Sequence, residues 1–143
     1  MTDKGLVLAA LAAAKGEAYQ PVHIQKFLFI VQEQAKEDTG SPFEFVPWHY
    51  GPFCLAVYEV LDDLSEEGLA TIMGEPRSPH RSYRATVEGQ RQGELALDQM
   101  PENIKDYLIR LSEWVRSQTF ASLVSAVYRK YPSTAVNSVF HRY

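Results

Sequence analysis

The side chains that could do covalent chemistry are few and scattered in this sequence. Cys54 follows His49 by five positions across a Tyr-Gly-Pro turn, and a cysteine at a helix N-terminus can acquire a lowered pKa and become nucleophilic. No residue nearby in the sequence could orient that pair, so the alternative is a buried structural cysteine. His23, His80 and His141 are isolated, and neither a zinc-ligand spacing nor a Gly-rich phosphate loop occurs. We therefore expect a protein that is not an enzyme and has no catalytic residue, metal or cofactor.

Carboxylates dominate residues 53–68, which carry five of them and contain no Lys, Arg, Asn or Gln. Helical spacing puts four of the five on one face, opposite a narrow apolar face, with two apolar residues at the N-terminal end. An apolar centre with an acidic rim would steer a basic protein partner. The predicted protein-binding residues are Leu55, Tyr58, Glu59, Asp62, Asp63 and Glu66. The alternative is the solvated outer side of an ordinary amphipathic helix.

Basic residues gather in and just after the loop at residues 74–82. Arg77, His80, Arg81 and Arg84 could contact phosphate or the minor groove. A solvated basic loop is the alternative. Because residues 53–68 offer no side chain of the kind that reads base edges in the major groove, sequence-specific DNA reading by that helix is not expected. Non-specific contact through the loop stays open.

Composition places the chain among ordinary globular proteins. Its 143 residues predict one domain, and 45% hydrophobic with 22% charged residues is typical of such domains. The net charge of −4 argues against a surface that tracks nucleic acid throughout. A single cysteine favours a reducing compartment, and we expect a cytoplasmic protein. Residues 4–14 imitate a signal peptide but continue into a helical domain, so we expect a first helix there. No apolar run is long enough for a membrane span.

Periodicity and turn residues predict the elements. Helices are expected at residues 3–15, from Pro21 onward and at 53–68, then from Thr86 to Asp98, from Pro101 and from Thr119 to Pro132. Strands are expected at 43–50, 70–73 and 83–87, the last two as a hairpin. The second helix is apolar on more than one side, which predicts a central helix or a partner surface. Trp48, Tyr50 and Phe53 are expected to pack the junction of strand and helix, with a ligand pocket as the alternative.

The order helix, helix, strand, helix, hairpin predicts a fold that is mainly α with a small antiparallel β-wing. We interpret residues 1–90 as a winged helix-turn-helix core and residues 91–143 as a helical extension of the same single domain. Apolar residues at heptad spacing in residues 101–131 could mediate a homodimer or be ordinary core. The tail at 132–143 keeps apolar residues and is expected to dock on the domain.

Three segments resemble a known family. VHIQKFLFIVQ, FVPWHYGPF and VYEVLDDLSEEGL are similar to the Panacea or SocA-like proteins, also called phage-associated proteins, over about residues 5–90. Phe27 and Phe29 stand where Leu and Tyr are common in that family, and the chain after residue 100 has no counterpart. The resemblance implies an antitoxin-type domain that neutralises a toxin by direct contact, or a phage- or defence-associated regulator.

The functional hypothesis is therefore a non-enzymatic protein-binding module that holds a partner protein, such as a basic toxin, on the acidic helix. The alternative is a DNA-binding transcriptional regulator that uses the basic wing. No membrane partner is expected.

Overall fold

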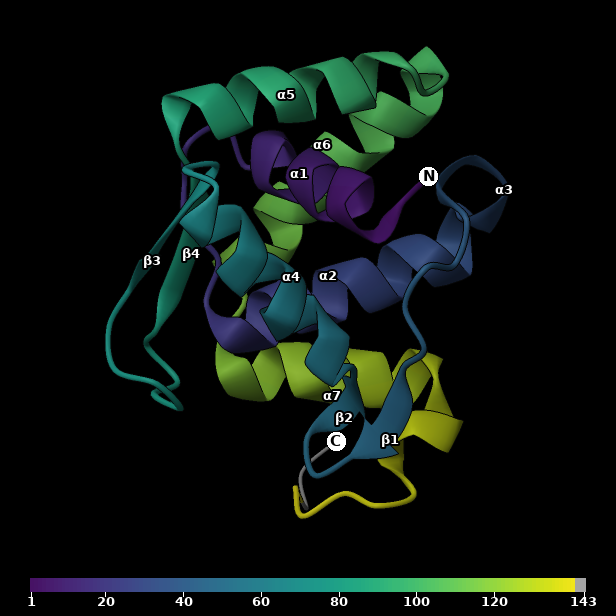
Figure 1. Ribbon diagram of the computed structural model, residues 1–143. Coiled ribbons are helices and arrows are strands. Elements are labelled where there is room, and N and C mark those ends of the chain that lie inside the picture. The colour runs from purple at the N-terminus through teal and green to yellow at the C-terminus, as the bar shows by residue number, and fades with distance from the viewer. Residues whose placement is uncertain (141–143) are drawn as a thin grey trace.

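The computed structural model describes residues 1–140 and is mainly helical, with two small antiparallel hairpins (Figure 1). This confirms the predicted class of a mainly α protein with a little antiparallel β structure. The elements in chain order are α1 (Asp3–Ala13), α2 (Pro21–Gln34), α3 (Lys36–Thr39), β1 (Val46–Trp48), β2 (Gly51–Phe53), α4 (Leu55–Glu66), β3 (Ala70–Met73), β4 (Ser82–Ala85), α5 (Val87–Asp98), α6 (Glu102–Ser117), α7 (Phe120–Lys130) and the 3-10 turn η1 (Pro132–Ala135).

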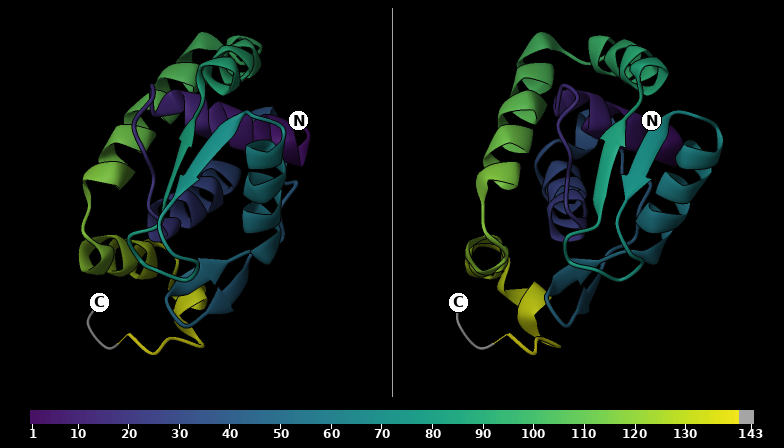
Figure 2. Two further views of the ribbon diagram at one scale, coloured as in Figure 1. Left: turned by 60° about the vertical axis from the view of Figure 1, so that its left-hand side comes forward. Right: turned by 90° about the vertical axis from the view of Figure 1, so that its left-hand side faces the viewer.

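Helices α1 and α2 form the centre, and the other long helices pack around them (Figures 1 and 2). In α1 every residue from Leu6 to Ala13 is buried, and α2 is buried without a break from Val22 to Gln32. The prediction of a central second helix is therefore confirmed. Within residues 1–140 no helix combines the length and the apolar character needed to cross a membrane.

Local signals set the helix ends where the sequence predicts them. Pro21 occupies the first turn of α2, where its missing N–H is no loss. The hydroxyl of Thr86 accepts a hydrogen bond from the Gly89 N–H at 3.0 Å, and that of Thr119 accepts one from the Ser122 N–H at 3.1 Å. Each of these hydroxyls satisfies a backbone donor that the first helical turn leaves without a partner.

The first hairpin differs from its prediction. Instead of one strand at 43–50 followed by a helix at 53–68, the chain forms β1, a two-residue turn and β2, and α4 begins only at Leu55. Pro47 lies opposite Pro52. Neither proline has an N–H, so the two can face each other only where the ladder needs no hydrogen bond between them. This pairing allows a proline-containing segment to close into a hairpin.

The second hairpin, β3–β4, forms as predicted and gains a third segment. Thr71 pairs with Arg84 and Ile72 with Tyr83. Tyr19, between α1 and α2, adds a bridge to the outer edge of β4: its N–H donates to the Tyr83 carbonyl and its carbonyl accepts from the Tyr83 N–H, both at 2.9 Å. The hairpin is thereby attached to the helical core.

Helix α5 carries glycines where it approaches other backbone, Gly93 against α1 and Gly89 against Leu69. A Cβ atom added to Gly93 would come within 2.3 Å of the Leu8 carbonyl oxygen and 2.6 Å of the Ala12 Cβ. One added to Gly89 would come within 1.8 Å of the Leu69 carbonyl oxygen. The Gly-x-x-x-Gly spacing of Gly89 and Gly93 is the sequence signal that could have indicated this close packing.

The C-terminal helices belong to the same core. Leu108 and Val115 of α6 and Leu123 and Val127 of α7 are buried in one cluster with α1 and α2. Most of the apolar residues at heptad spacing in residues 101–131 therefore pack against the core of this same chain.

A buried polar chain ties α6 to the centre. The Tyr19 hydroxyl donates to the Ala10 carbonyl and accepts from the Ser112 hydroxyl, each at 2.6 Å, and the Arg116 guanidinium donates to the Ser112 oxygen at 3.1 Å. Burial raises the pKa of Tyr19, so its hydroxyl stays a donor.

The tail docks as expected through residue 140. The Val139 N–H donates to the His49 carbonyl at 2.9 Å and the Asn137 amide to the Pro47 carbonyl at 3.0 Å. Figure 1 shows this segment beside the β1–β2 hairpin. The rest of the predicted tail, 141–143, lies outside the described residues.

Replacing Gly93 by Ala should destabilise the protein. In an unconstrained helix Gly→Ala raises stability by about 0.5–1 kcal/mol, but here the methyl group would collide with α1, and overpacking costs about 1–3 kcal/mol. Urea unfolding followed by circular dichroism should show the decrease. Glu94→Ala, on the exposed side of α5, should change stability by less than about 0.5 kcal/mol. A Gly93→Ala protein as stable as the parent would contradict the close packing.

Candidate functional site

Two glutamines of α2 hold both ends of the segment that forms the first hairpin. Gln25 makes a paired hydrogen bond with Cys54: its amide N–H donates to the Cys54 carbonyl and its carbonyl accepts from the Cys54 N–H, both at 2.9 Å. Gln32 does the same with Phe43, at 2.9 and 3.0 Å. The glutamines are two helical turns apart and so share a face. They fix where residues 43–54 leave and rejoin the core.

Lys26 lies between Gln25 and Gln32 in the sequence and is almost completely buried, with 4% of its surface exposed. Its ammonium nitrogen donates to the Pro52 carbonyl at 3.3 Å. The ion pairs of the described residues are Lys4–Glu67, Arg91–Glu88 and Lys105–Asp98, so no carboxylate neutralises Lys26 there. Burial lowers the pKa of Lys26 to about 8, because removal from water penalises the charged form.

Lys26 lines a cavity of about 260 Å³ whose walls are mostly aromatic, called here the aromatic pocket. It forms where the hairpin turn meets the N-terminal ends of α2 and α7 and the first turn of α4. Its lining consists of Pro21, Val22, Lys26, Trp48, His49, Tyr50, Gly51, Phe53, Tyr58 and Phe120. No carboxylate is in this set.

Ring contacts fix the walls of the aromatic pocket. Trp48 stacks on His49 with centroids 4.7 Å apart, and Tyr50 meets Phe120 edge to face at 5.0 Å. Gly51 has a φ of +103°, which only glycine adopts readily. A side chain there would lie 3.5 Å from the Lys26 Cε atom and 3.8 Å from its Nζ atom. The glycine therefore keeps space open next to the buried ammonium.

The expectation that the turn aromatics are core is wrong for two of the three. Trp48 is 50% exposed and Tyr50 is 44% exposed, while Phe53 is half-buried. The turn projects from the helices instead of folding beneath them, so its side chains form the rim of a cavity. The ligand-pocket alternative for these residues is not tested by their positions, which show only that they line a cavity.

The acidic face of α4 forms as predicted, with one exception. Glu59, Asp62, Asp63 and Glu66 are exposed, and Leu55, the first residue of the helix, is 62% exposed. All of them lie on the outer side of α4, opposite the buried apolar residues of that helix.

Tyr58 is the exception. It is packed instead of projecting from that face: its ring stacks on Tyr83 at 6.0 Å and contacts Phe53 at 5.8 Å. Burial raises the pKa of Tyr58 to about 12. The reason is the β3–β4 hairpin, which covers the side of α4 that carries this residue.

The basic loop keeps three of its four predicted residues exposed. Arg77, His80 and Arg84 are exposed. Arg81 instead folds back: its guanidinium donates to the Gly74 carbonyl at 3.2 Å and lies 6.0 Å from the centre of the Tyr83 ring. Arg81 therefore serves the shape of the loop, and the predicted cluster is smaller than the sequence indicates.

His49 and Cys54 do not form a catalytic pair. His49 is in the exposed turn, stacked on Trp48, whereas Cys54 lies beyond the far end of β2, where it is buried and precedes α4. A whole strand separates them. The alternative of a buried structural cysteine is the correct one.

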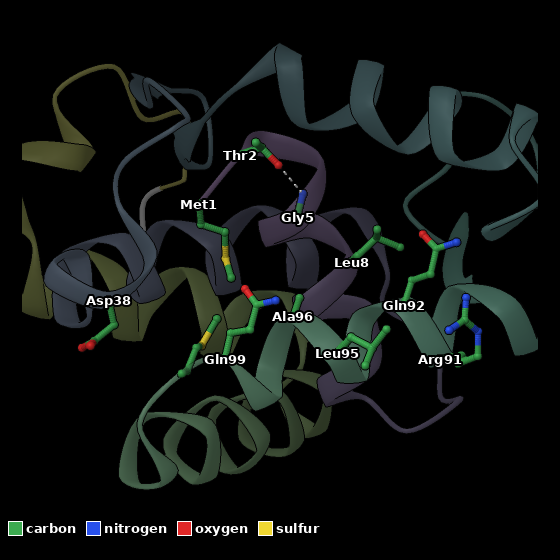
Figure 3. Close-up of a pocket in the computed structure, with 11 residues that line it drawn as sticks. Met1, Thr2, Gly5, Leu8, Asp38, Arg91, Gln92, Leu95, Ala96 and Gln99 are labelled. Carbon is green, nitrogen blue, oxygen red and sulfur yellow. Dashed lines mark hydrogen bonds between the residues drawn. The ribbon is translucent and has the colours of Figure 1, made fainter.

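A larger depression, of about 740 Å³, lies between the first turn of α1 and α5. Figure 3 shows Asp38 and Arg91 at its opposite ends, with the Thr2–Gly5 capping hydrogen bond between them. Both charged residues are exposed, and Arg91 is already paired with Glu88. With no buried polar group aimed at it, this depression lacks what distinguishes the aromatic pocket.

Gln25→Leu should lower the free energy of unfolding by roughly 1–3 kcal/mol, because it leaves the buried Cys54 N–H without a partner, while the Cys54 carbonyl keeps its hydrogen bond from the Val57 N–H at 3.2 Å. The same change at exposed Gln34, which makes one hydrogen bond to Tyr131, should cost less than about 1 kcal/mol. Chemical unfolding of both variants provides the comparison. Equal losses of stability in the two variants would show that the hydrogen bonds between Gln25 and Cys54 contribute no more than an ordinary surface contact.

The buried charge of Lys26 should make stability depend on pH. An unfolded lysine has a pKa of about 10.4, and folding lowers that of Lys26 to about 8. Between these values the unfolded chain binds more protons, so stability rises with pH. The stability of the wild type minus that of Lys26→Met should increase by on the order of 2 kcal/mol between about pH 7.5 and 10. A pH-independent difference would contradict the buried position of the ammonium.

Comparison with known proteins does not assign this site. No protein-family model matches the chain, and no curated protein sequence matches it significantly. The resemblance to the Panacea or SocA-like proteins thus stays a prediction. What the site does has to be argued from its own geometry.

Proposed function

We propose that this protein is a non-enzymatic binding module that holds a partner protein on the outer face of α4. The observation that carries the proposal is Leu55, a large apolar side chain 62% exposed at one end of a row of exposed carboxylates. Single exposed apolar residues are common. This one shares the outer face of α4 with Glu59 and Asp62, which follow it at helical spacings of four and seven residues.

The charges favour a basic partner. The outward carboxylates Glu59, Asp62, Asp63 and Glu66 have no ion-pair partner among the described residues. They would attract a basic surface and raise its rate of association. A basic nucleic-acid-cutting toxin is one partner of this kind, in keeping with the antitoxin-type role that the family resemblance implies.

A winged-helix arrangement is part of the proposal. The order α1, α2, α4 and then the β3–β4 hairpin supports it, and so does the bridge of Tyr19 to the edge of β4 as a third short strand. In that arrangement α4 has the place of the helix that enters DNA in DNA-binding relatives of the fold. Its acidic outer face would be repelled by phosphate.

DNA binding through the hairpin loop is the second candidate. The exposure of Arg77, His80 and Arg84 favours it. The two guanidinium groups and the imidazole could contact phosphate without reading sequence.

Leu55→Asp should weaken partner binding at least tenfold, since central apolar contacts carry most of the energy of an interface. Aspartate at the first position of α4 suits the helix dipole, so the fold should be kept. Affinity purification with the tagged protein, followed by titration of the recovered partner, measures the effect. Val87→Asp is a matched control, because Val87 is 91% exposed but lies at the start of α5.

A charge-reversal variant and a DNA-binding assay test the rest of the proposal. Glu59→Lys combined with Asp62→Lys should slow association and reduce its dependence on salt.

Duplex DNA should not be retarded in a gel at low salt. Retardation that Arg77→Ala with Arg84→Ala removes would favour the DNA-binding alternative, and a partner retained in full by Leu55→Asp would contradict binding through α4.

A further inference from the structure

We propose that the aromatic pocket binds a ligand of about one amino-acid residue in size, an aromatic ring that carries a carboxylate, with the carboxylate on the Lys26 ammonium. The proposal is independent of the partner surface on α4. It rests on a buried cation without a counter-ion, on the cavity beside it and on the aromatic walls of that cavity.

The buried ammonium of Lys26 has unused binding capacity. An ammonium group has three N–H donors, and the partner of this one among residues 1–140 is the Pro52 carbonyl, at the long distance of 3.3 Å. A charge in so dry a position is costly unless it is paired. Burial lowers its pKa only to about 8, so the group is still mostly protonated at pH 7. An incoming anion would supply the missing counter-charge.

The cavity selects the charge of that anion. Among the described residues that line the pocket, Lys26 is the only Lys or Arg, and none carries a carboxylate that would repel a negative ligand. One buried positive charge balances one negative charge, whereas a phosphate would bring an excess of charge into a low-dielectric site. A carboxylate matches the single ammonium.

The aromatic residues that line the pocket indicate which uncharged group of a ligand would fit. Trp48, Tyr50, Phe53, Tyr58 and Phe120 present ring faces and edges, which favour aromatic groups in offset or edge-to-face contact. A volume of about 260 Å³ falls just below the range of about 300–1,000 Å³ for drug-sized ligands, so one ring with a short linker suits it. Such a group exists both in free aromatic acids and at the C-terminus of a peptide that ends in phenylalanine.

Fluorescence titration of Trp48 tests the proposal at the site itself. The sequence has two tryptophans, so Trp114→Phe leaves Trp48 as the only one. At pH 7 N-acetylphenylalanine should bind about 10- to 100-fold more tightly than its neutral amide, the factor expected for a hydrogen bond to a charged group. This comparison needs no change at Lys26. Phenylacetate and the peptide Ala-Ala-Phe then separate the two sources: tighter binding of phenylacetate indicates a free acid, and tighter binding of the peptide indicates a chain end.

Variants locate the anion. In the same background Lys26→Met should abolish the preference for acid over amide, while Lys36→Met, at an exposed lysine, should keep it. Leu55→Asp should also keep it, so failure here is distinguishable from failure of the partner surface. Equal affinity for acid and amide, an unchanged preference in Lys26→Met, or no binding of any probe at millimolar concentration would overturn the proposal.

Discussion

The burial of α2 on all sides is the constraint on which the rest of the structure depends. A helix so placed cannot leave Gln25, Lys26 and Gln32 to water, and buried polar groups must find partners inside the protein. The backbone of residues 43–54 supplies them, through Cys54, Pro52 and Phe43. That segment is thereby held against the core at both ends, although its own hairpin has only three residues in each strand.

Both candidate surfaces follow from this attachment. Because the ends of the segment are fixed, the turn between them must project, and Trp48 and Tyr50 project with it. The same anchor at Cys54 sets the start of α4 and so the direction in which its carboxylates face. The proposed partner surface and the aromatic pocket thus both depend on one set of buried hydrogen bonds.

The sequence predicts elements better than it predicts which faces they cover. Caps, prolines and periodicity give the helices and the β3–β4 hairpin, since these signals act within a few residues. Tyr58 was assigned to the open face of α4 because helical spacing alone cannot show that a hairpin covers part of that face. Arg81 was counted as a free cation because its partner, the Gly74 carbonyl, is reached only when the loop has closed.

The sequence by itself determined a mainly helical domain, its central second helix, and an acidic helix without base-reading side chains, because composition and local spacing carry that information. Only the tertiary structure decided that α5 approaches α1 closely enough to require Gly93, and that Lys26 is buried beside a cavity. Both depend on contacts between segments far apart in the chain. A lysine on a helix reads as solvated until every side of that helix is known to be covered, and that knowledge lies in the packing.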